Sequence, residues 1–113
     1  MAVTIYHNPK CSNSRDALEI IRRAGIEPTI VEYLDAPLTA ADIAALLAAM
    51  KAKPRDIMRA KESIFAELHL DGASDAQLIE AIAANPILLN RPIVVTDKGA
   101  RLCRPPELVR DLL

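Results

Sequence analysis

The chain has 113 residues, about the length of one domain, and carries 14 Lys and Arg against 15 Asp and Glu, for a formal net charge of −1. This balance excludes a strongly basic protein that coats nucleic acid, and the 51% of hydrophobic residues excludes an intrinsically disordered chain. Aromatic residues make up only 3%, too few for a platform that stacks RNA bases, so we expect one globular domain over 1–113 that binds no nucleic acid.

The start of the chain predicts a β-α-β unit. Residues 3–6 are a short β-branched and aromatic run that stops before Pro9, which is typical of a strand entering a loop. From Ser14 onward apolar residues recur at helical spacing until Gly25, a residue that favours a left-handed helix cap. A second strand is expected over 28–34.

The middle of the chain predicts helices. Thr39 is followed three residues later by an acid, which forms a capping box, and apolar residues then recur at helical spacing as far as Met50. Ser74 starts a second capped helix that ends before Pro86. Between the two helices, residues 54–70 predict shorter helical pieces.

The last part of the chain predicts a hairpin. Residues 91–96 form a strand, 97–99 a turn and 100–103 its partner, after which Pro105 opens a short helix. This order of elements predicts an α/β fold, with a mixed β-sheet and flanking helices in one domain.

Neither a membrane span nor secretion is expected. No run of about 18 apolar residues occurs, and the first residues lack the basic and apolar regions of a secretory signal. Cys11 and Cys103 are too few for a disulfide-stapled module. We therefore expect a cytoplasmic protein whose cysteines stay reduced unless catalysis oxidises one of them.

Cys11 lies at the predicted start of the first helix. A thiol there faces unpaired backbone N–H groups and the positive end of the helix dipole, and both favour the thiolate. Lys10 and Arg15 add positive charge and residues 12–14 offer hydrogen-bond donors, so the same loop can hold an anion. The alternative is an inert cysteine packed at a helix start, as most free cysteines are.

Two further residues of this loop bear on the thiol. His7 precedes Cys11 by four residues and either influences the thiol electrostatically or serves as a hydrogen-bonded structural residue. Ser14 stands where a dithiol motif has its second cysteine, so an oxidised Cys11 needs a thiol from elsewhere. Metal binding is not expected, because the cysteines and histidines show no paired-ligand spacing.

Arginines provide the second signal, at Arg59, Arg91, Arg101 and Arg104. Side-chain alternation along the last strand sends Arg101 and Cys103 to one face and Arg104 to the other, so the two arginines should differ in role. Each arginine taken singly fits a solvated surface charge. Together with an activated thiol they indicate recognition of a tetrahedral oxyanion. Cys103 is most simply a packed small residue, with a redox role as the alternative.

Three separated segments together resemble the glutaredoxin-coupled arsenate reductases, the ArsC family: IYHNPKCSNSR at 5–15, NRPIVV at 90–95 and RLCRP at 101–105. The resemblance covers nearly the whole chain. It implies a thioredoxin-like fold with a helical insertion, in which Pro92 is a cis-proline that faces the active-site loop. Longer reductases of this type carry a C-terminal tail beyond the point where this chain stops.

The resemblance also implies residue roles, with Cys11 as the nucleophile, Arg59, Arg91 and Arg104 as oxyanion-binding residues, and His7 and Ser14 as thiolate-stabilising residues. The implied reaction reduces arsenate to arsenite: Cys11 attacks arsenic, glutathione adds to the adduct, and glutaredoxin clears the resulting mixed disulfide. Glutathione is then a co-substrate, no tightly bound cofactor is expected, and we expect a monomer.

Two other functions share features with this one. The related Spx-type regulators have a Cys-x-x-Cys pair, which this chain lacks because position 14 is Ser14. A thioredoxin-like oxyanion-binding or regulatory module without arsenate turnover is the remaining alternative.

Overall fold

The computed structural model describes all residues, 1–113, and they form two compact units. The first unit joins the two ends of the chain, Met1–Ala36 and Arg91–Leu113, and the second comprises Pro37–Asn90. In chain order the second unit is therefore an insertion within the first. The sequence-based expectation of one domain over 1–113 stays a prediction.

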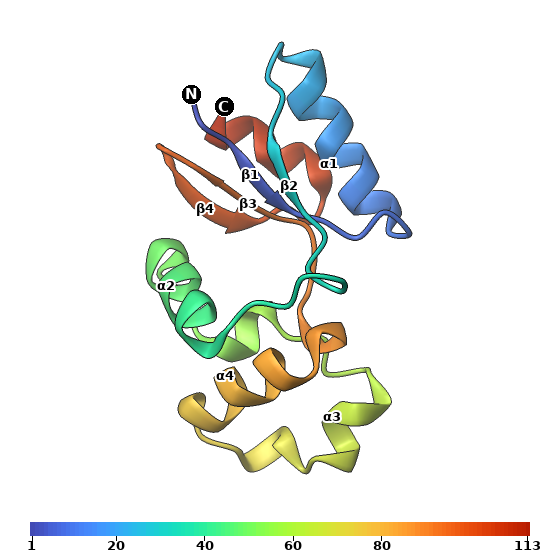
Figure 1. Ribbon diagram of the computed structural model, residues 1–113, viewed down its shortest axis with the longest axis vertical. Helices are drawn as coiled ribbons and strands as arrows, with labels where there is room; N and C mark the ends of the chain where they lie inside the picture. Colours follow the sequence, from blue (N-terminus) through green and yellow to red (C-terminus); the bar gives the residue numbers. More distant parts are fainter. The chain divides into compact units, whose positions relative to one another are not determined.

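The first unit is built on a four-stranded sheet in the order β2-β1-β3-β4 (Figure 1). Strand β1 pairs parallel with β2 and antiparallel with β3, and β3 pairs antiparallel with β4. The predicted α/β class with a mixed sheet is confirmed. The elements of this unit are β1 (Thr4–Tyr6), α1 (Ser12–Arg23), β2 (Thr29–Val31), β3 (Ile93–Thr96), β4 (Gly99–Leu102) and a 3-10 helix over Pro106–Leu112.

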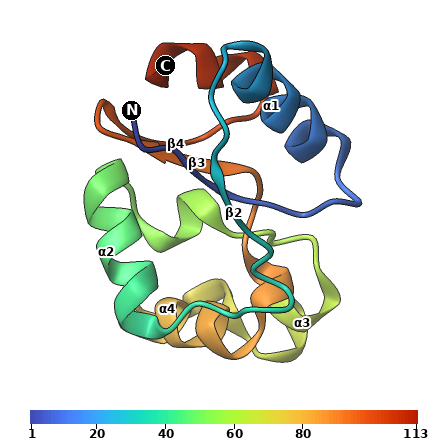
Figure 2. The ribbon, with the colours of Figure 1, turned by 45° about the horizontal axis from the view of Figure 1, so that its top comes forward.

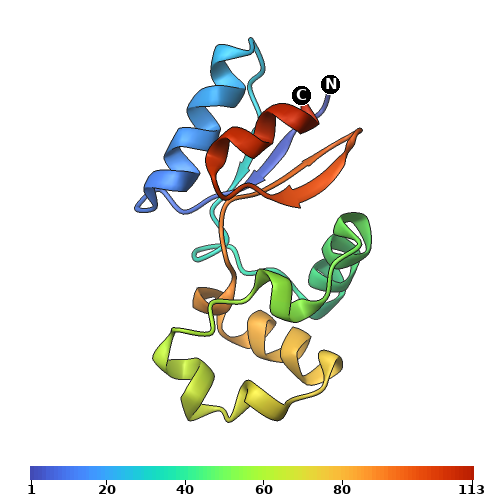
Figure 3. The same cartoon turned by 180° about the vertical axis from the view of Figure 1, so that it is seen from behind.

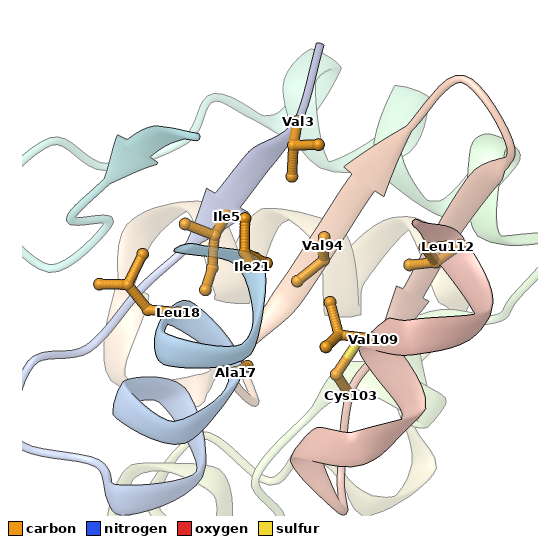
Figure 4. Close-up of a cluster of buried hydrophobic side chains, with 9 residues drawn as sticks. All are labelled: Val3, Ile5, Ala17, Leu18, Ile21, Val94, Cys103, Val109 and Leu112. Carbon is orange, nitrogen blue, oxygen red and sulfur yellow. The ribbon is translucent and has the colours of Figure 1, made fainter. Parts of the chain in front are cut away.

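Helix α1 and the C-terminal 3-10 helix cover the same face of this sheet, as seen from behind in Figure 3. Alternation along the strands turns Ile5 and Val94 toward that face, where they meet the buried stripe of α1 that contains Ile21 (Figure 4). The remaining members of this core are Val3, Ala17, Leu18, Cys103, Val109 and Leu112. The apolar spacing of α1 thus fixes how the helix lies on the sheet.

The first β-α-β unit differs from the prediction in four bounds, and β1 and β2 each begin one residue later than expected, at Thr4 and Thr29. Strand β2 ends at Val31 rather than reaching residue 34, because the Glu32 carbonyl accepts the N–H groups of Asp35 and Ala36 and turns the chain away from the sheet. Helix α1 begins two residues before the predicted start. Its end is as predicted, since Gly25 follows it with a φ of +82°.

The second unit is helical, as the insertion predicted from the resemblance requires. Helix α2 (Ala40–Met50) packs against α4 (Asp75–Ala84) (Figure 2). Both predicted capping boxes are confirmed, by Thr39 with Asp42 and by Ser74 with Gln77. The shorter pieces are α3 (Ser63–Glu67) and 3-10 helices over Pro54–Ile57, Leu70–Gly72 and Pro86–Leu88.

The packing of α1 on the sheet leads to a stability prediction. Ile21 is fully buried, so Ile21→Ala should lower the free energy of unfolding by about 2–5 kcal/mol through lost burial and the cavity left behind. Arg23→Ala on the same helix is the control, because it removes only an exposed ion pair with Glu19 worth about 0.2–0.5 kcal/mol. Denaturant unfolding of both variants provides the test. Equal losses would mean that α1 does not depend on this contact.

Candidate active site

The loop between β1 and α1 is held by its own hydrogen bonds. The Cys11 N–H donates to the Asn8 carbonyl at 3.0 Å, and the Asn8 side-chain oxygen accepts the Lys10 N–H at 3.0 Å. The Arg15 guanidinium reaches back from α1 to the Pro9 carbonyl at 2.9 Å. These contacts hold the chain in one path, which places Cys11 at the residue that precedes the first turn of α1.

The buried Cys11 sulfur faces hydrogen-bond donors. Burial of the thiol raises its pKa, but the backbone N–H of Ser14, the Arg91 guanidinium and the backbone N–H of Asn13 outweigh burial and hold the pKa of Cys11 below its ordinary value. Arg91 acts both through its charge and through a side-chain hydrogen bond to the thiol. The sulfur therefore carries more thiolate at neutral pH than a free cysteine does.

A second guanidinium reaches the same sulfur. Arg104 Nη1 lies 3.8 Å from Cys11 Sγ and donates to the Arg91 carbonyl at 2.9 Å. Cys11 thus has cationic donors from two residues that lie far along the chain. Two guanidinium groups beside a thiolate form a site for a tetrahedral oxyanion, because their planar N–H pairs match its oxygens.

The register of the sheet explains why these two arginines meet. In the β3–β4 hairpin Ile93 pairs with Leu102, and a hydrogen bond from Cys103 N–H to the Pro92 carbonyl continues the pairing by one step. Just beyond this bond, the Arg104 side chain reaches the Arg91 carbonyl. Pairing of β1 with β3 brings the loop after Tyr6 to the same end of the sheet. The peptide bonds Arg91–Pro92 and Arg104–Pro105 are both cis.

His7 and Ser14 form a buried pair behind the thiol. His7 Nδ1 lies 2.6 Å from Ser14 Oγ, which also accepts the Asn8 N–H at 3.1 Å. Burial lowers the pKa of His7; Glu32 raises it and Arg22 and Arg15 lower it, with a net lowering. The ring is then mostly neutral at pH 7, so His7 contributes by fixing Ser14 rather than by adding a positive charge.

The structure brings together Cys11, His7, Ser14, Arg91 and Arg104 within the first unit, but Arg59 belongs to the second. There its guanidinium pairs with Glu62 at 2.6 Å. A role for Arg59 toward an oxyanion stays a prediction.

Sequence reasoning counted Asn13 among the donors of the loop but missed the contact of its side chain with Arg104. With the amide oriented so that its oxygen faces Arg104, which the donors around it require, that oxygen accepts from both Nη1 and Nη2 at 3.2 Å each. A polar residue in the first turn of a helix is ordinarily explained by capping, and no local pattern signals a partner more than 90 residues away.

Arg101 and Cys103 lie away from this cluster of donors. Arg101 pairs with Asp111 of the C-terminal 3-10 helix at 3.0 Å, whereas Arg104 faces Cys11, which agrees with the predicted strand faces. Cys103 is fully buried in the core, and burial raises its pKa to about 12. The second thiol is therefore protonated and packed.

No group of three or more His, Cys, Asp or Glu side chains is placed to hold a metal ion. None of the helices is both long and apolar enough to span a membrane.

The residues around Cys11 lie within a segment that matches a known protein family. The family model described as "ArsC family" matches residues 6–112. The chain belongs to the ArsC family. An arsenate reductase of Rhizobium meliloti (strain 1021) is 51% identical over 115 residues, which cover 100% of this chain and 82% of the relative. An arsenate reductase of Escherichia coli is 47% identical over 113 residues, or 98% of this chain and 80% of the relative.

A solved structure of this family agrees with the fold. The arsenate reductase from Vibrio cholerae superposes with a TM-score of 0.95 at 40% identity, covering 100% of this chain and 98% of that one. The predicted α/β class, a thioredoxin-like mixed sheet with flanking helices, is confirmed for this ArsC-family chain.

The donors around Cys11 predict a pH-dependent reactivity. Because its pKa is lowered, the rate of iodoacetamide alkylation of Cys103→Ala protein should reach half its maximum below pH about 8.5, the value for a free thiol. The buffer must lack sulfate and phosphate, since a bound anion would raise the pKa again. A rate that titrates like that of a free thiol would mean that this loop does not activate Cys11.

The different partners of the last arginines predict different effects on anion binding. Arg104→Ala should weaken sulfate or arsenate binding by the roughly 1.5–3 kcal/mol typical of a hydrogen bond to a charged group. Arg101→Ala is the matched control, since its guanidinium pairs with Asp111, and should change binding little. Anion binding by each variant is measured as the protection of Cys11 from alkylation when the anion is added. An equal loss in the two variants would contradict the assignment of Arg104 to the site.

Proposed function

We propose that this ArsC-family protein reduces arsenate to arsenite, with Cys11 as the nucleophile and with glutathione and glutaredoxin as the source of electrons. The observation that carries the proposal is the Cys11 sulfur, which lies at the start of α1 beside the guanidinium groups of Arg91 and Arg104 and has a lowered pKa. The relatives named arsenate reductase, at 47–51% identity, support arsenate as the oxyanion.

The first step forms a bond between sulfur and arsenic. The Cys11 thiolate attacks arsenic of arsenate, and one arsenic-bound hydroxyl takes up a proton and leaves as water. Negative charge gathers on the remaining oxygens, where Arg91 and Arg104 can stabilise it. Arsenic is still As(V) at this stage, since sulfur has only replaced an oxygen ligand. The same guanidinium groups thus serve both the thiolate and the adduct.

The second step moves two electrons to arsenic. A glutathione thiolate adds to the adduct and bonds to the Cys11 sulfur, and the electron pair of the broken S–As bond stays on arsenic. Arsenite, As(III), leaves, and Cys11 remains in a mixed disulfide with glutathione. Glutaredoxin then takes over the glutathione by thiol–disulfide exchange, which restores the Cys11 thiolate.

The position of Ser14 supports an external thiol. It occupies the position at which a dithiol motif has its resolving cysteine, and its hydroxyl is already engaged with His7 and Asn8. Cys103, the other thiol of the chain, is fully buried with a raised pKa. The chain therefore offers no activated second thiol, and the proposed scheme takes one from glutathione.

The proposed reaction also needs a co-substrate, a protein partner and a reducing compartment. Glutathione is a co-substrate rather than a bound cofactor, glutaredoxin is the protein partner, and the enzyme works as a monomer in the reducing cytoplasm. An oxyanion-binding role for Arg59 rests on the family resemblance alone.

A coupled assay tests the function. NADPH, glutathione reductase, glutathione, glutaredoxin and arsenate are combined with the protein, and oxidation of NADPH is followed. Cys11→Ser should abolish arsenate-dependent turnover, whereas Cys103→Ala should retain most of it because that thiol only packs in the core. A folded wild-type protein without turnover would favour the oxyanion-binding module instead. Loss of turnover in a folded Cys103→Ala protein would give the second thiol a redox role.

A further inference from the structure

Asn13 is the second residue of α1 and touches the thiol site in two ways. Its backbone N–H is among the groups that lower the pKa of Cys11. Its side chain turns toward Arg104, where the amide oxygen accepts from Nη1 and Nη2 at 3.2 Å each. The oxygen is assigned to this side of the amide because the opposite orientation would set donors against donors.

We propose that Asn13 is a positioning residue, which holds the Arg104 guanidinium over the Cys11 sulfur and so fixes the place where an oxyanion is bound. The part of the proposal that concerns the oxyanion rests on the proposed function. The part that concerns the guanidinium and the sulfur rests on contacts within the first unit alone.

The contacts of Arg104 show what Asn13 adds. The residue follows β4 and is exposed, and a long arginine side chain in water samples many rotamers. Its Nη1 has two hydrogens and faces three acceptors: Cys11 Sγ at 3.8 Å, the Arg91 carbonyl at 2.9 Å and the Asn13 amide oxygen. Asn13 alone accepts from both Nη1 and Nη2, so its oxygen adds a contact at the second terminal nitrogen and helps to hold the plane of the guanidinium. Holding that plane before an anion arrives lowers the entropic cost of binding.

Helix capping is the competing explanation for an asparagine here. Asn and Ser are common near helix starts because their side chains accept backbone N–H groups. The Asn13 oxygen instead meets a guanidinium whose residue lies at the far end of the chain. The backbone N–H of residue 13 is retained in any substitution except proline, so Asn13→Ala removes the side-chain contact and leaves the backbone donor of the thiol in place.

The first experiment is done without added anion and does not depend on arsenate turnover. In Cys103→Ala protein, the iodoacetamide rate of Cys11 at pH 6.5 is measured for Asn13→Ala, Arg104→Ala and the double variant. Arg104→Ala should slow alkylation by about threefold to tenfold because a donor to the thiolate is lost. Asn13→Ala should slow it by less, and it should change the rate by less than about twofold once Arg104 is absent.

Arg101→Ala is the matched control, because its guanidinium pairs with Asp111 away from the thiol and its loss should leave the rate unchanged. If Asn13→Ala slows alkylation as much without Arg104 as with it, the side chain acts independently of the guanidinium and the proposal is overturned. If Asn13→Ala does not fold, Asn13→Ser replaces it, since serine suits a helix start but is one bond too short for the contact.

The second experiment measures anion binding by protection of Cys11 from alkylation. Asn13→Ala should weaken sulfate and arsenate binding by about threefold to tenfold, the range for one lost hydrogen bond, and should have no such effect in Arg104→Ala protein. Unchanged anion binding in Asn13→Ala would overturn the oxyanion part of the proposal. Absence of arsenate turnover in wild-type protein would overturn the proposed function, while coupling of Asn13 to Arg104 in the first experiment would still stand.

Discussion

The backbone N–H groups of Ser14 and Asn13 face the Cys11 sulfur and lower its pKa, and the rest of this site depends on this electrostatic interaction. The interaction exists only because α1 begins immediately after Cys11, so that the first turn of the helix presents unpaired donors near the thiol. The position of the helix on the sheet is in turn fixed by its apolar stripe, which packs against the sheet through Ala17, Leu18 and Ile21. Packing of an ordinary helix on an ordinary sheet thus determines the chemistry of one sulfur atom.

Ser14 links this interaction to the surrounding loop. Its N–H faces the sulfur, while its hydroxyl contacts His7 and accepts the Asn8 N–H, and Asn8 in turn accepts the N–H of Cys11. A cysteine at position 14 would lose much of this network, because sulfur is a weak hydrogen-bond partner. Ser14 therefore stands in place of an internal resolving cysteine and also helps to hold Cys11 in position. Reliance on an external thiol and activation of Cys11 follow from one serine.

Much of this arrangement could be predicted from sequence, because local signals are strong where hydrophobic periodicity and capping agree. The capping boxes at Thr39 and Ser74, the hairpin after residue 91 and the place of Cys11 before a helix all come from such signals. The predicted second strand was too long, because the apolar and aromatic residues Tyr33 and Leu34 continue past the point where the Glu32 carbonyl turns the chain. The contact of Asn13 with Arg104 was missed, because it depends on the register of β3 with β4 and on the path of a loop more than 90 residues earlier.

Mass spectrometry of a single turnover tests the proposed use of Cys11 most directly. When the protein is mixed with arsenate and glutathione and no glutaredoxin is present, the scheme predicts one glutathione on Cys11 per arsenite released, and none on the buried Cys103. Glutaredoxin added afterwards should remove this glutathione and restore the free thiol. Arsenite released while Cys11 stays unmodified, or glutathione bound to Cys11 equally without arsenate, would contradict the mechanism.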